Sequence, residues 1–368
     1  MSKDPIRYAV VGLGNIAQAA VLPGFANAEN SRLVALISSD ETKRRELGAH
    51  YRVERAGGYD EFEDILHACR VDAVYIATPN EQHREYTERA ARAGVHVLCE
   101  KPMANTEADC RAMIRACDDH GVQLMIAYRL HFEAANLHVI DLIRSGRIGE
   151  PRLFLSMLTQ QVRPGDIRTR PDVGGGAIYD EGVYPINAAR YLFRDEPIGG
   201  LCRVLPGHDD RMPEVDATTS ALLEFPRGRI AQFTVSQELA GVSWFRLVGT
   251  EGDLQLEGAY DYKAPMKLTV TVGGEQVEAR EFTPRDQFGP ELIYFSDCIQ
   301  NGRTPEPSGE EGLADVRIIT ALLESARRGV AVAIRPIART RRPEPDQEID
   351  RPAVEPPAEV HAPPPTIG

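Results

Sequence analysis

A glycine-rich turn follows the first apolar run of the chain. The run Tyr8-Ala9-Val10-Val11 leads directly into Gly12-Leu13-Gly14-Asn15-Ile16-Ala17, which matches the pattern G-x-G-x-x-G/A. In this pattern the first glycine allows a tight turn, the second lets the backbone approach a pyrophosphate, and the small last residue permits close packing of helix on strand. Free N–H groups at the start of the helix favour an anion. The turn therefore predicts a strand–turn–helix unit that binds a dinucleotide.

Short apolar runs alternate with helix-like stretches over the first 127 residues. The runs Leu33–Ile37, Ala73–Ala77 and Val95–Leu98 are apolar without alternation, which is typical of strands buried on both faces of a parallel sheet. Stretches of helical period, 81–93 and 107–120, lie between and after them. Alternation of this kind indicates βαβ units. We therefore predict an α/β fold in which residues 1–127 form a Rossmann domain with a doubly wound parallel sheet.

Strand patterns predominate further along the chain. Residues 219–225 and 229–235 flank Pro226-Arg227-Gly228, and similar pairs are 243–249 with 253–257 and 266–272 with 276–282. These pairs predict hairpins in a large, open, mainly antiparallel sheet. We expect an α+β domain over residues 128–335. The remainder, 336–368, holds nine of the 26 prolines and few large apolar residues, which predicts a disordered tail.

Composition narrows the class of partner. The chain has 42 Lys and Arg against 55 Asp and Glu, a net charge of −13, without the basic clusters that nucleic acid or an anionic membrane surface requires. Its six cysteines contain no C-x-x-C pair, so neither a metal site nor a disulfide framework is indicated. No apolar run approaches the ~20 residues of a membrane span, and residues 1–5 leave no room for an export signal. We expect a cytoplasmic protein with a small-molecule partner.

The end of the second strand bears on the choice of dinucleotide. NAD-binding domains usually carry an acidic residue there for the ribose 2′-hydroxyl, whereas this chain has Ser38-Ser39-Asp40 followed by Lys43-Arg44-Arg45. A hydroxyl and nearby cations suit a 2′-phosphate. NADP is therefore the predicted cofactor, and NAD is the alternative because Asp40 lies within reach. The candidate contacts in this half of the domain are Gly12, Gly14, Asn15, Ile16, Ser38, Ser39, Lys43 and Arg44.

Two further segments carry side chains suited to chemistry. Glu100-Lys101-Pro102 ends the strand 95–98, and open α/β sheets bind ligands at the carboxyl ends of their strands. Downstream, three glycines from Gly174 precede Asp180 and Tyr184, which are spaced four residues apart. That spacing places them on one face of a helix, and Pro185 is tolerated only near the helix start. Lys101, Asp180 and Tyr184 are therefore candidate site residues.

Together these motifs resemble the Gfo/Idh/MocA family of nicotinamide-dependent oxidoreductases. The resemblance extends over residues 6–334, and Tyr184, where many members have histidine, points to the glucose–fructose oxidoreductase branch. The other motifs that carry it are Thr78–His83, Tyr128–Phe132, Asn187, Arg190–Leu192, Gly249–Gly252 and Pro307–Gly312. It implies a second domain that binds substrate and joins subunits through its open sheet, as a homodimer or homotetramer.

The resemblance also implies roles for individual residues. Lys101 and Tyr184 form the catalytic pair, with Asp180 in support. The implied cofactor contacts beyond the first two strands are Tyr59, Thr78, Pro79, Asn80, His83, Glu100, Lys101, Arg129 and Arg168. Taken by itself, His83 is typical of a histidine on a surface helix, so its role depends on the resemblance alone.

The expected reaction transfers a hydride between the nicotinamide and the carbinol or carbonyl carbon of a sugar, polyol or cyclic diol. Tyrosine ordinarily has a pKa near 10, and a lysine cation within reach favours its phenolate form. Tyr184 is then the acid–base group, Lys101 holds the substrate oxygen, and Asp180 orients substrate or Lys101. Two alternatives stay open: a trans-dihydrodiol or D-xylose dehydrogenase of the same family, and a dinucleotide-sensing regulator without turnover. The presence of all three candidate residues counts against the regulator.

Overall fold

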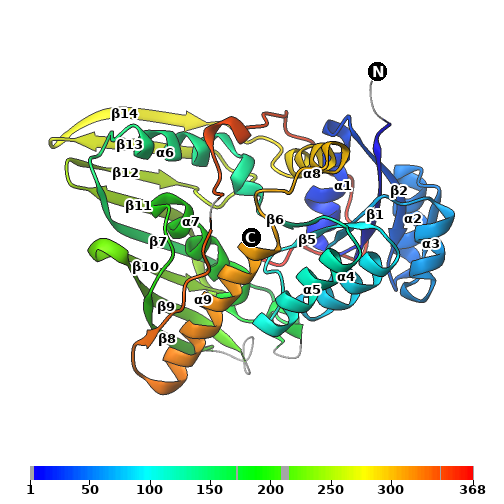
Figure 1. Cartoon of the computed structure of the whole chain (residues 1–368), viewed down its shortest axis with the longest axis horizontal. Helices are drawn as coiled ribbons and strands as arrows, with labels where there is room; N and C mark the ends of the chain where they lie inside the picture. Colours follow the sequence, from blue (N-terminus) through cyan, green and yellow to red (C-terminus); the bar gives the residue numbers. More distant parts are fainter. Residues whose placement is uncertain (1–3, 171–172, 209–214, 340, 368) are drawn as a thin grey trace. The chain divides into compact units, whose positions relative to one another are not determined.

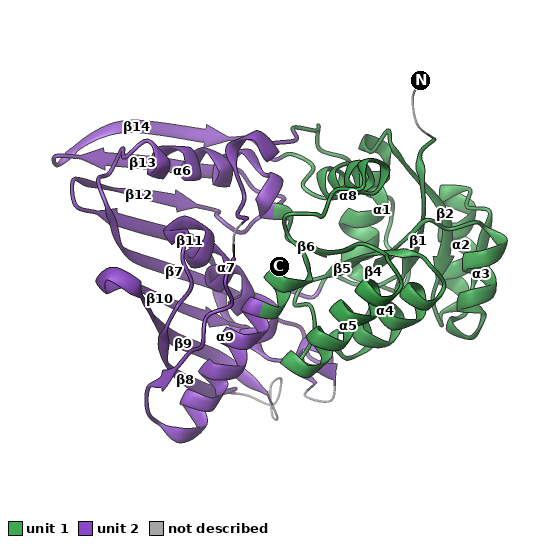
Figure 2. Ribbon diagram, viewed as in Figure 1, with its two compact units in different colours: residues 1–129, 285–313, 350–364 green, residues 130–284, 314–349, 365–368 purple. Residues whose placement is uncertain are grey.

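Two units, each made of several chain segments, make up the protein. The computed structural model describes residues 4–170, 173–208, 215–339 and 341–367. Figure 2 shows unit 1, with residues 1–129, 285–313 and 350–364, in green, and unit 2, with residues 130–284, 314–349 and 365–368, in purple. The segment 285–313 thus belongs with the first unit, whereas the sequence assigns it to the second domain.

Unit 1 contains the predicted Rossmann sheet. Within its described residues, six parallel strands lie in the order β3-β2-β1-β4-β5-β6 (Figure 1). The strands are β1 (Ile6–Val11), β2 (Ser31–Ile37), β3 (Arg55–Gly57), β4 (Ala73–Ile76), β5 (His96–Glu100) and β6 (Leu124–Ala127). The apolar side chains of β1 and β4 are almost fully buried, as expected for strands covered on both faces. The α/β prediction is confirmed.

Helices cover the Rossmann sheet. They are α1 (Leu22–Gly24), α2 (Glu41–Tyr51), α3 (Phe62–Ala68), α4 (His83–Arg92), α5 (Glu107–Asp119) and α8 (Gly289–Asn301). Helix α4 packs on β4 and β5, and α8 packs on β2 and α1. The hydroxyl of Ser296 in α8 lies 2.9 Å from the Tyr8 hydroxyl and 2.7 Å from the Ser31 hydroxyl. These buried hydrogen bonds explain why α8 returns to unit 1.

Unit 2 contains a large mixed sheet. Among its described residues, nine strands lie in the order β14-β13-β12-β11-β7-β10-β9-β8-β15. They are β7 (Pro151–Gln161), β8 (Gly199–Pro206), β9 (Asp216–Phe225), β10 (Arg229–Ser236), β11 (Glu238–Gly249), β12 (Gly252–Glu257), β13 (Met266–Val272), β14 (Glu275–Phe282) and β15 (Val332–Ala333). The three predicted hairpins are present as β9–β10, β11–β12 and β13–β14, each antiparallel. Among the described strands of this sheet, β7 and β10 form the only parallel pair. The sheet is therefore mainly antiparallel, as predicted.

One face of the large sheet is covered by helices. The helices of unit 2 are α6 (Ala134–Arg144), α7 (Val183–Phe193) and most of α9 (Gly309–Arg328). Helix α7 packs on β7, and the Ser325 hydroxyl of α9 accepts a hydrogen bond from the backbone N–H of Cys202 in β8 at 3.0 Å. The opposite face leaves Leu201, Leu205 and Ile230 exposed. Assembly through this face stays a prediction.

The proline-rich segment after Pro336 differs from the disordered tail that the sequence predicts. In unit 2, the Arg342 side chain is only 7% exposed and donates to Glu196 at 2.6 Å. In unit 1, Arg351 donates to Glu29 at 2.8 Å, and the Asn27 amide donates to the carbonyl oxygen of Pro352 at 2.8 Å. Polar contacts with the two units hold the segment in place, and it has no apolar core of its own. Its low content of large apolar residues therefore could not predict that it is ordered.

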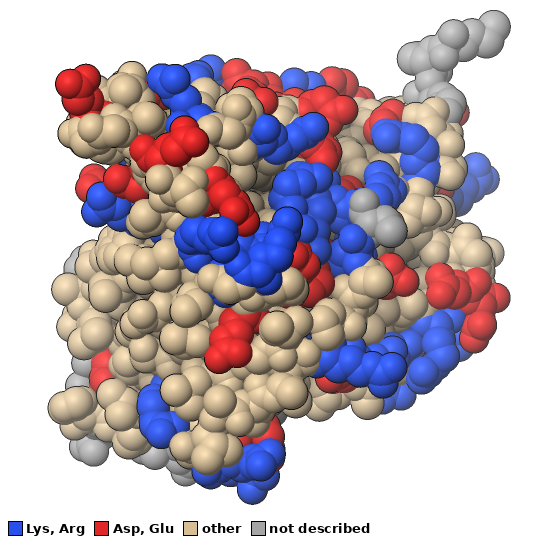
Figure 3. Space-filling model, turned by 60° about the vertical axis from the view of Figure 1, so that its left-hand side comes forward, with Lys and Arg blue, Asp and Glu red and all other residues tan. Residues whose placement is uncertain are grey.

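The described helices include none that is both long and apolar enough to cross a membrane. On the face drawn in Figure 3, basic and acidic side chains are interspersed. A mixed surface of this kind agrees with the modest net charge for a chain of this length.

Candidate active site

The glycine-rich turn has the geometry that a diphosphate requires. Gly12 has a φ of +91°, and a Cβ at this position would lie 2.6 Å from the carbonyl oxygen of Ala77, so only glycine fits. A Cβ at Gly14 would meet nothing within 4 Å beyond its chain neighbours, which leaves the backbone open to close approach. Asn15 and Ile16 follow at the start of the helical segment. These residues fit a dinucleotide.

The carboxyl end of β2 brings the predicted 2′-phosphate residues together. Ser38 is buried, and its hydroxyl accepts a hydrogen bond from the Asp40 N–H at 3.2 Å. Arg44 donates to the carbonyl oxygen of Ser38 at 2.8 Å and to that of Ser39 at 3.5 Å. Partial burial lowers the pKa of Lys43, whose backbone N–H donates to the Asp40 carboxylate at 3.0 Å. Hydroxyl and cationic groups thus surround this strand end.

The loop after β4 supplies an unsatisfied polar atom. Thr78 is buried, and its hydroxyl oxygen has no hydrogen-bond partner among the described residues. A buried hydroxyl without a partner costs free energy, so a ligand that bonds to it is favoured. Pro79 and Asn80 follow it at the edge of the sheet. The orphaned hydroxyl supports a ligand at this strand end.

His83 lies in the interior rather than on a surface helix. Its side chain is fully buried, with Nε2 3.0 Å from the Thr78 carbonyl oxygen and Nδ1 3.1 Å from that of Pro102. Burial lowers the pKa of His83, which favours the neutral ring. His83 therefore ties the loop after β4 to the loop that carries Lys101. Tyr59, another predicted contact, packs its ring against Tyr86 at 5.3 Å.

Glu100 at the end of β5 belongs to a buried carboxyl pair. The Tyr75 hydroxyl donates to Glu100 at 2.8 Å and lies 3.4 Å from Glu291 of α8. Burial raises the pKa of both carboxyl groups. Glu100 also accepts the backbone N–H of Lys101 at 3.2 Å, which fixes the start of the Lys101 loop. Tyr75 and Glu291 are site neighbours that the sequence analysis missed.

Arg129 is anchored by the same late segment of the chain. It is buried, and its guanidinium donates to the side-chain oxygen of Gln287, just before α8. Gln287 and Glu291 lie more than 150 residues after their partners, so no local pattern identifies them. Only the packing of α8 beside the carboxyl ends of the strands brings these residues to the site.

Unit 2 holds the other predicted catalytic residues. Asp180 lies in a π-helical turn, Ile178–Gly182, that continues into α7, and Tyr184 is the second residue of α7. Because the helical backbone already begins at Ala177, Pro185 lies eight residues inside it, and the predicted position near a helix start is wrong. The Tyr184 ring lies 5.8 Å from that of Tyr260.

Arg168 engages Asp180 directly. Its Nε donates to the Asp180 carboxylate, and its Nη1 donates to Asp166 at 3.1 Å. Although burial opposes the charged form, Asp180, Asp166 and Glu181 together raise the pKa of the Arg168 guanidinium. The family resemblance predicts Arg168 along the cofactor and Asp180 beside substrate or Lys101, and their pairing is additional to that prediction.

A buried polar network fixes helix α7. Arg190 is fully buried and donates to Asp315 at 2.6 Å and to Glu196 at 2.7 Å. The Asn187 amide nitrogen donates to Asp315 at 2.9 Å, and its side-chain oxygen accepts a hydrogen bond from Nε2 of His131 at 2.7 Å. The network therefore ties α7, the helix that carries Tyr184, to Asp315 of α9.

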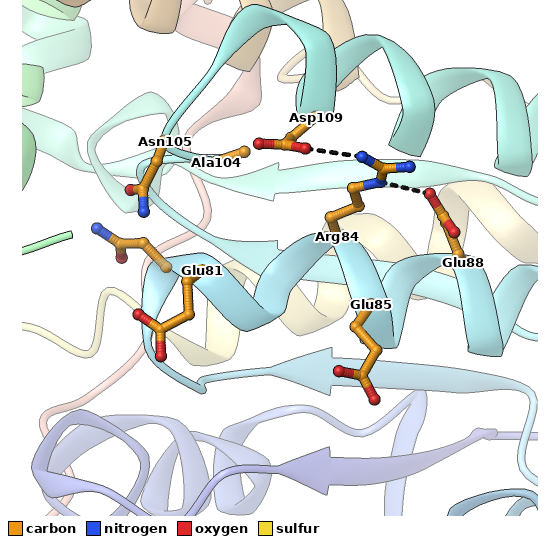
Figure 4. A pocket seen from close by; sticks show the side chains of 8 residues that line it. Glu81, Arg84, Glu85, Glu88, Ala104, Asn105 and Asp109 are labelled. Carbon is orange, nitrogen blue, oxygen red and sulfur yellow. Dashed lines mark hydrogen bonds and ion pairs between the residues drawn. The ribbon is translucent and has the colours of Figure 1, made fainter. Parts of the chain in front are cut away.

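A separate pocket lies between α4 and the start of α5 (Figure 4). Arg84 crosses it and pairs with Glu88 at 2.7 Å and with Asp109 at 2.9 Å. Of the predicted site residues, only Asn80 lines it. The pocket therefore contributes little to the candidate site.

Comparisons with known proteins identify the family. A model described as an oxidoreductase family with an NAD-binding Rossmann fold matches residues 6–128, and a model of the Gfo/Idh/MocA C-terminal domain matches residues 137–255. The chain belongs to the Gfo/Idh/MocA family of oxidoreductases. The resemblance predicted from the motifs is confirmed.

Family members of similar length cover nearly the whole chain. A structure of aldose–aldose oxidoreductase from Caulobacter crescentus, complexed with glycerol, is 37% identical, with a TM-score of 0.85, and covers 90% of this chain and 100% of that one. D-xylose 1-dehydrogenase [NADP(+)] from Haloarcula marismortui is 33% identical over 330 residues, 88% of this chain and 91% of its own. A 3-ketoreductase from Actinomadura kijaniata, in complex with NADP and TDP-benzene, is 28% identical, with a TM-score of 0.80, and covers 88% of this chain and 98% of that one.

Proposed function

We propose that this family member is an NADP-dependent oxidoreductase that oxidises a hydroxyl, or reduces a carbonyl, of a sugar. The observation that carries the proposal is the edge of the Rossmann sheet. Parallel strands β1, β2, β4 and β5 end there together and present Gly12, Ser38, Thr78 and Lys101 in turn. In open α/β sheets this edge is where ligands bind. A dinucleotide along it runs from the 2′-phosphate end at Ser38 toward Lys101.

NADP is the cofactor that the end of β2 suits best. The first position after the strand is a buried serine rather than an acid, and Lys43 and Arg44 stand close by. The ketoreductase and the xylose dehydrogenase are both named with NADP, which supports the same choice. NAD stays the alternative.

The cofactor choice has a test at Ser38. We expect Ser38→Asp to weaken NADP binding at least tenfold, about 1.4 kcal/mol, because the new carboxylate repels the 2′-phosphate. NAD binding should change little or improve. Calorimetric titration of both dinucleotides measures the effect, with Ser38→Ala as the matched control for loss of the hydroxyl. Equal NADP affinity in Ser38→Asp and the parent protein would refute the 2′-phosphate assignment.

The proposed chemistry assigns one task to each catalytic group. The bound nicotinamide supplies hydride transfer. Tyr184 accepts the proton of the substrate hydroxyl in oxidation and returns it in reduction. Lys101 holds the substrate oxygen in both directions of the reaction. Asp180, which is held by Arg168, orients the substrate.

Variants of a relative give independent support for these residue types. The structures of the Actinomadura ketoreductase include one with a tyrosine changed to phenylalanine and one with a lysine changed to alanine. In that protein the tyrosine and the lysine were thus each chosen for substitution. We extend the same pair of residue types to Tyr184 and Lys101.

Aldoses are the substrates to test first. Two relatives, at 37% and 33% identity, are named for aldose chemistry. We expect purified protein with NADP⁺ and an aldose to produce NADPH. The absorbance band of NADPH measures its formation. A panel of aldoses, polyols and cyclic diols separates the sugar proposal from a trans-dihydrodiol dehydrogenase. NADP binding without turnover of any of them would favour a dinucleotide-sensing regulator.

A further inference from the structure

The C-terminal segment 359–362 lies against the glycine-rich turn of its own unit. Gln18, one residue after that turn, is buried to 1% exposure. Its amide nitrogen donates to the carbonyl oxygens of Leu13 and Val360, each at 2.9 Å, and its amide oxygen accepts the Val360 N–H at 2.8 Å. Gln18 thus links the turn to both backbone polar groups of Val360. A single side chain that satisfies both is a specific attachment.

The turn itself makes a second attachment. The Asn15 amide donates to the Glu359 carboxylate at 3.0 Å and to the carbonyl oxygen of Ala362 at 3.0 Å. Ala362 is buried, although it lies in a proline-rich segment near the end of the chain. The turn and the segment therefore hold each other through side chains on one side and backbone on the other.

The same segment reaches the other end of the candidate dinucleotide site. The His361 ring lies with Nδ1 2.9 Å from the Asp40 carboxylate, and Asp40 is two residues after Ser38. Contacts at residues 15, 18 and 40 bracket the region between the diphosphate turn and the 2′-phosphate residues. Segment 359–362 spans this region from one side to the other.

The segment borders the diphosphate position without filling it. The space beside Gly14 stays open to 4 Å even with residues 359–362 in place. Prolines flank the segment at positions 356–357 and 363–365, which restrict the unattached chain and lower the entropy lost when it docks. Both features favour a wall that stands beside a bound dinucleotide over a plug that replaces it.

We propose that residues 359–362 form the outer wall of the dinucleotide site and hold the bound NADP in place. Release of the cofactor then requires the strap 359–362 to detach from Asn15, Gln18 and Asp40. The proposal rests on NADP as the cofactor. It adds residues 359–362, from the end of the chain, to the predicted cofactor contacts. It also gives the proline-rich segment a function.

The experiment measures cofactor release by displacement in stopped-flow fluorescence. Val360→Pro removes the N–H that Gln18 accepts, and Val360→Ala keeps it, so the two form a matched pair. A chain that ends at Ala353 removes the whole strap. We expect release of NADPH to speed up about tenfold in Val360→Pro and more in the shortened chain, with Val360→Ala close to the parent protein. Circular dichroism checks that each variant is folded.

Two results would overturn the strap. Unchanged release in both Val360→Pro and the shortened chain would mean that residues 359–362 do not retain the cofactor. Tighter NADPH binding in either variant would mean that the segment competes with the dinucleotide. Failure of the parent protein to bind NADPH would instead refute the cofactor assignment.

Discussion

Tyr184→Phe should lower kcat by about 10²–10⁴-fold while the Kd for NADP stays the same. The reason is that the substitution removes only the hydroxyl that exchanges a proton with substrate, and general acid–base catalysis contributes a factor of this size. Tyr184 is the second residue of α7 and belongs to unit 2, whereas the glycine-rich turn belongs to unit 1. Steady-state kinetics with the best aldose and calorimetry with NADP⁺ measure the two effects.

Tyr260→Phe is the matched control for this prediction. The two tyrosine rings lie 5.8 Å apart, but the Tyr260 hydroxyl is buried against that of Ser156 at 2.7 Å. Its loss should change kcat only a few-fold, since the hydroxyl already has a partner inside the protein. If Tyr184→Phe turns over at the parent rate, or if both variants lose activity equally, Tyr184 is not the acid–base group.

Arg190→Met should lower the free energy of unfolding by about 3–5 kcal/mol, the usual cost of removing one partner from a buried ion pair. Arg190 is fully buried between Asp315 and Glu196, and methionine fills similar space without a charge. Asn187 would still donate to Asp315, and Arg342 would still donate to Glu196. Denaturation in urea, followed by circular dichroism, measures the change.

A surface arginine gives the comparison for the buried one. Arg327 pairs with Glu324 on α9 at 2.7 Å, with 73% of its side chain exposed. Arg327→Met should cost no more than about 1 kcal/mol, since exposed ion pairs contribute little. Equal losses of stability in the two variants would contradict the role of the buried network in holding α7.

The sequence predicts the parts of this protein that depend on local patterns. The Gly12–Ala17 turn and the Glu100-Lys101-Pro102 motif are each contiguous, and each lies at the carboxyl end of a buried parallel strand. The hairpins of unit 2 are likewise formed by neighbours in the sequence. Such features need no knowledge of distant contacts, and the structure contains all of them.

The parts that the sequence did not predict depend on contacts between distant segments. Glu291 meets Tyr75 of β4, and Gln287 meets Arg129 just after β6, only because α8 returns to unit 1. His83 lies in a stretch with the sequence pattern of a surface helix. Its ring is nevertheless buried, where it contacts the backbone carbonyl oxygens of Thr78 and Pro102. Residues 359–362 dock through side chains of Asn15 and Gln18, which a proline-rich composition cannot reveal.

The pairing of Arg168 with Asp180 is a further example. The eleven residues between them include three consecutive glycines, so neither helical nor strand spacing relates the two side chains. The individual roles of Lys101, Asp180 and Tyr184 stay predictions, because they come from motif and family rather than from a measured reaction.

Transfer of an isotope from substrate to cofactor tests the central claim most directly. Aldoses that carry deuterium at the carbinol carbon to be oxidised would be incubated with the protein and NADP⁺, and the NADPH analysed by mass spectrometry. The account predicts NADPH one mass unit heavier with the deuterated sugar, and no such product from Tyr184→Phe on the same timescale. NADPH without deuterium, or no NADPH from any aldose, polyol or diol, would contradict it.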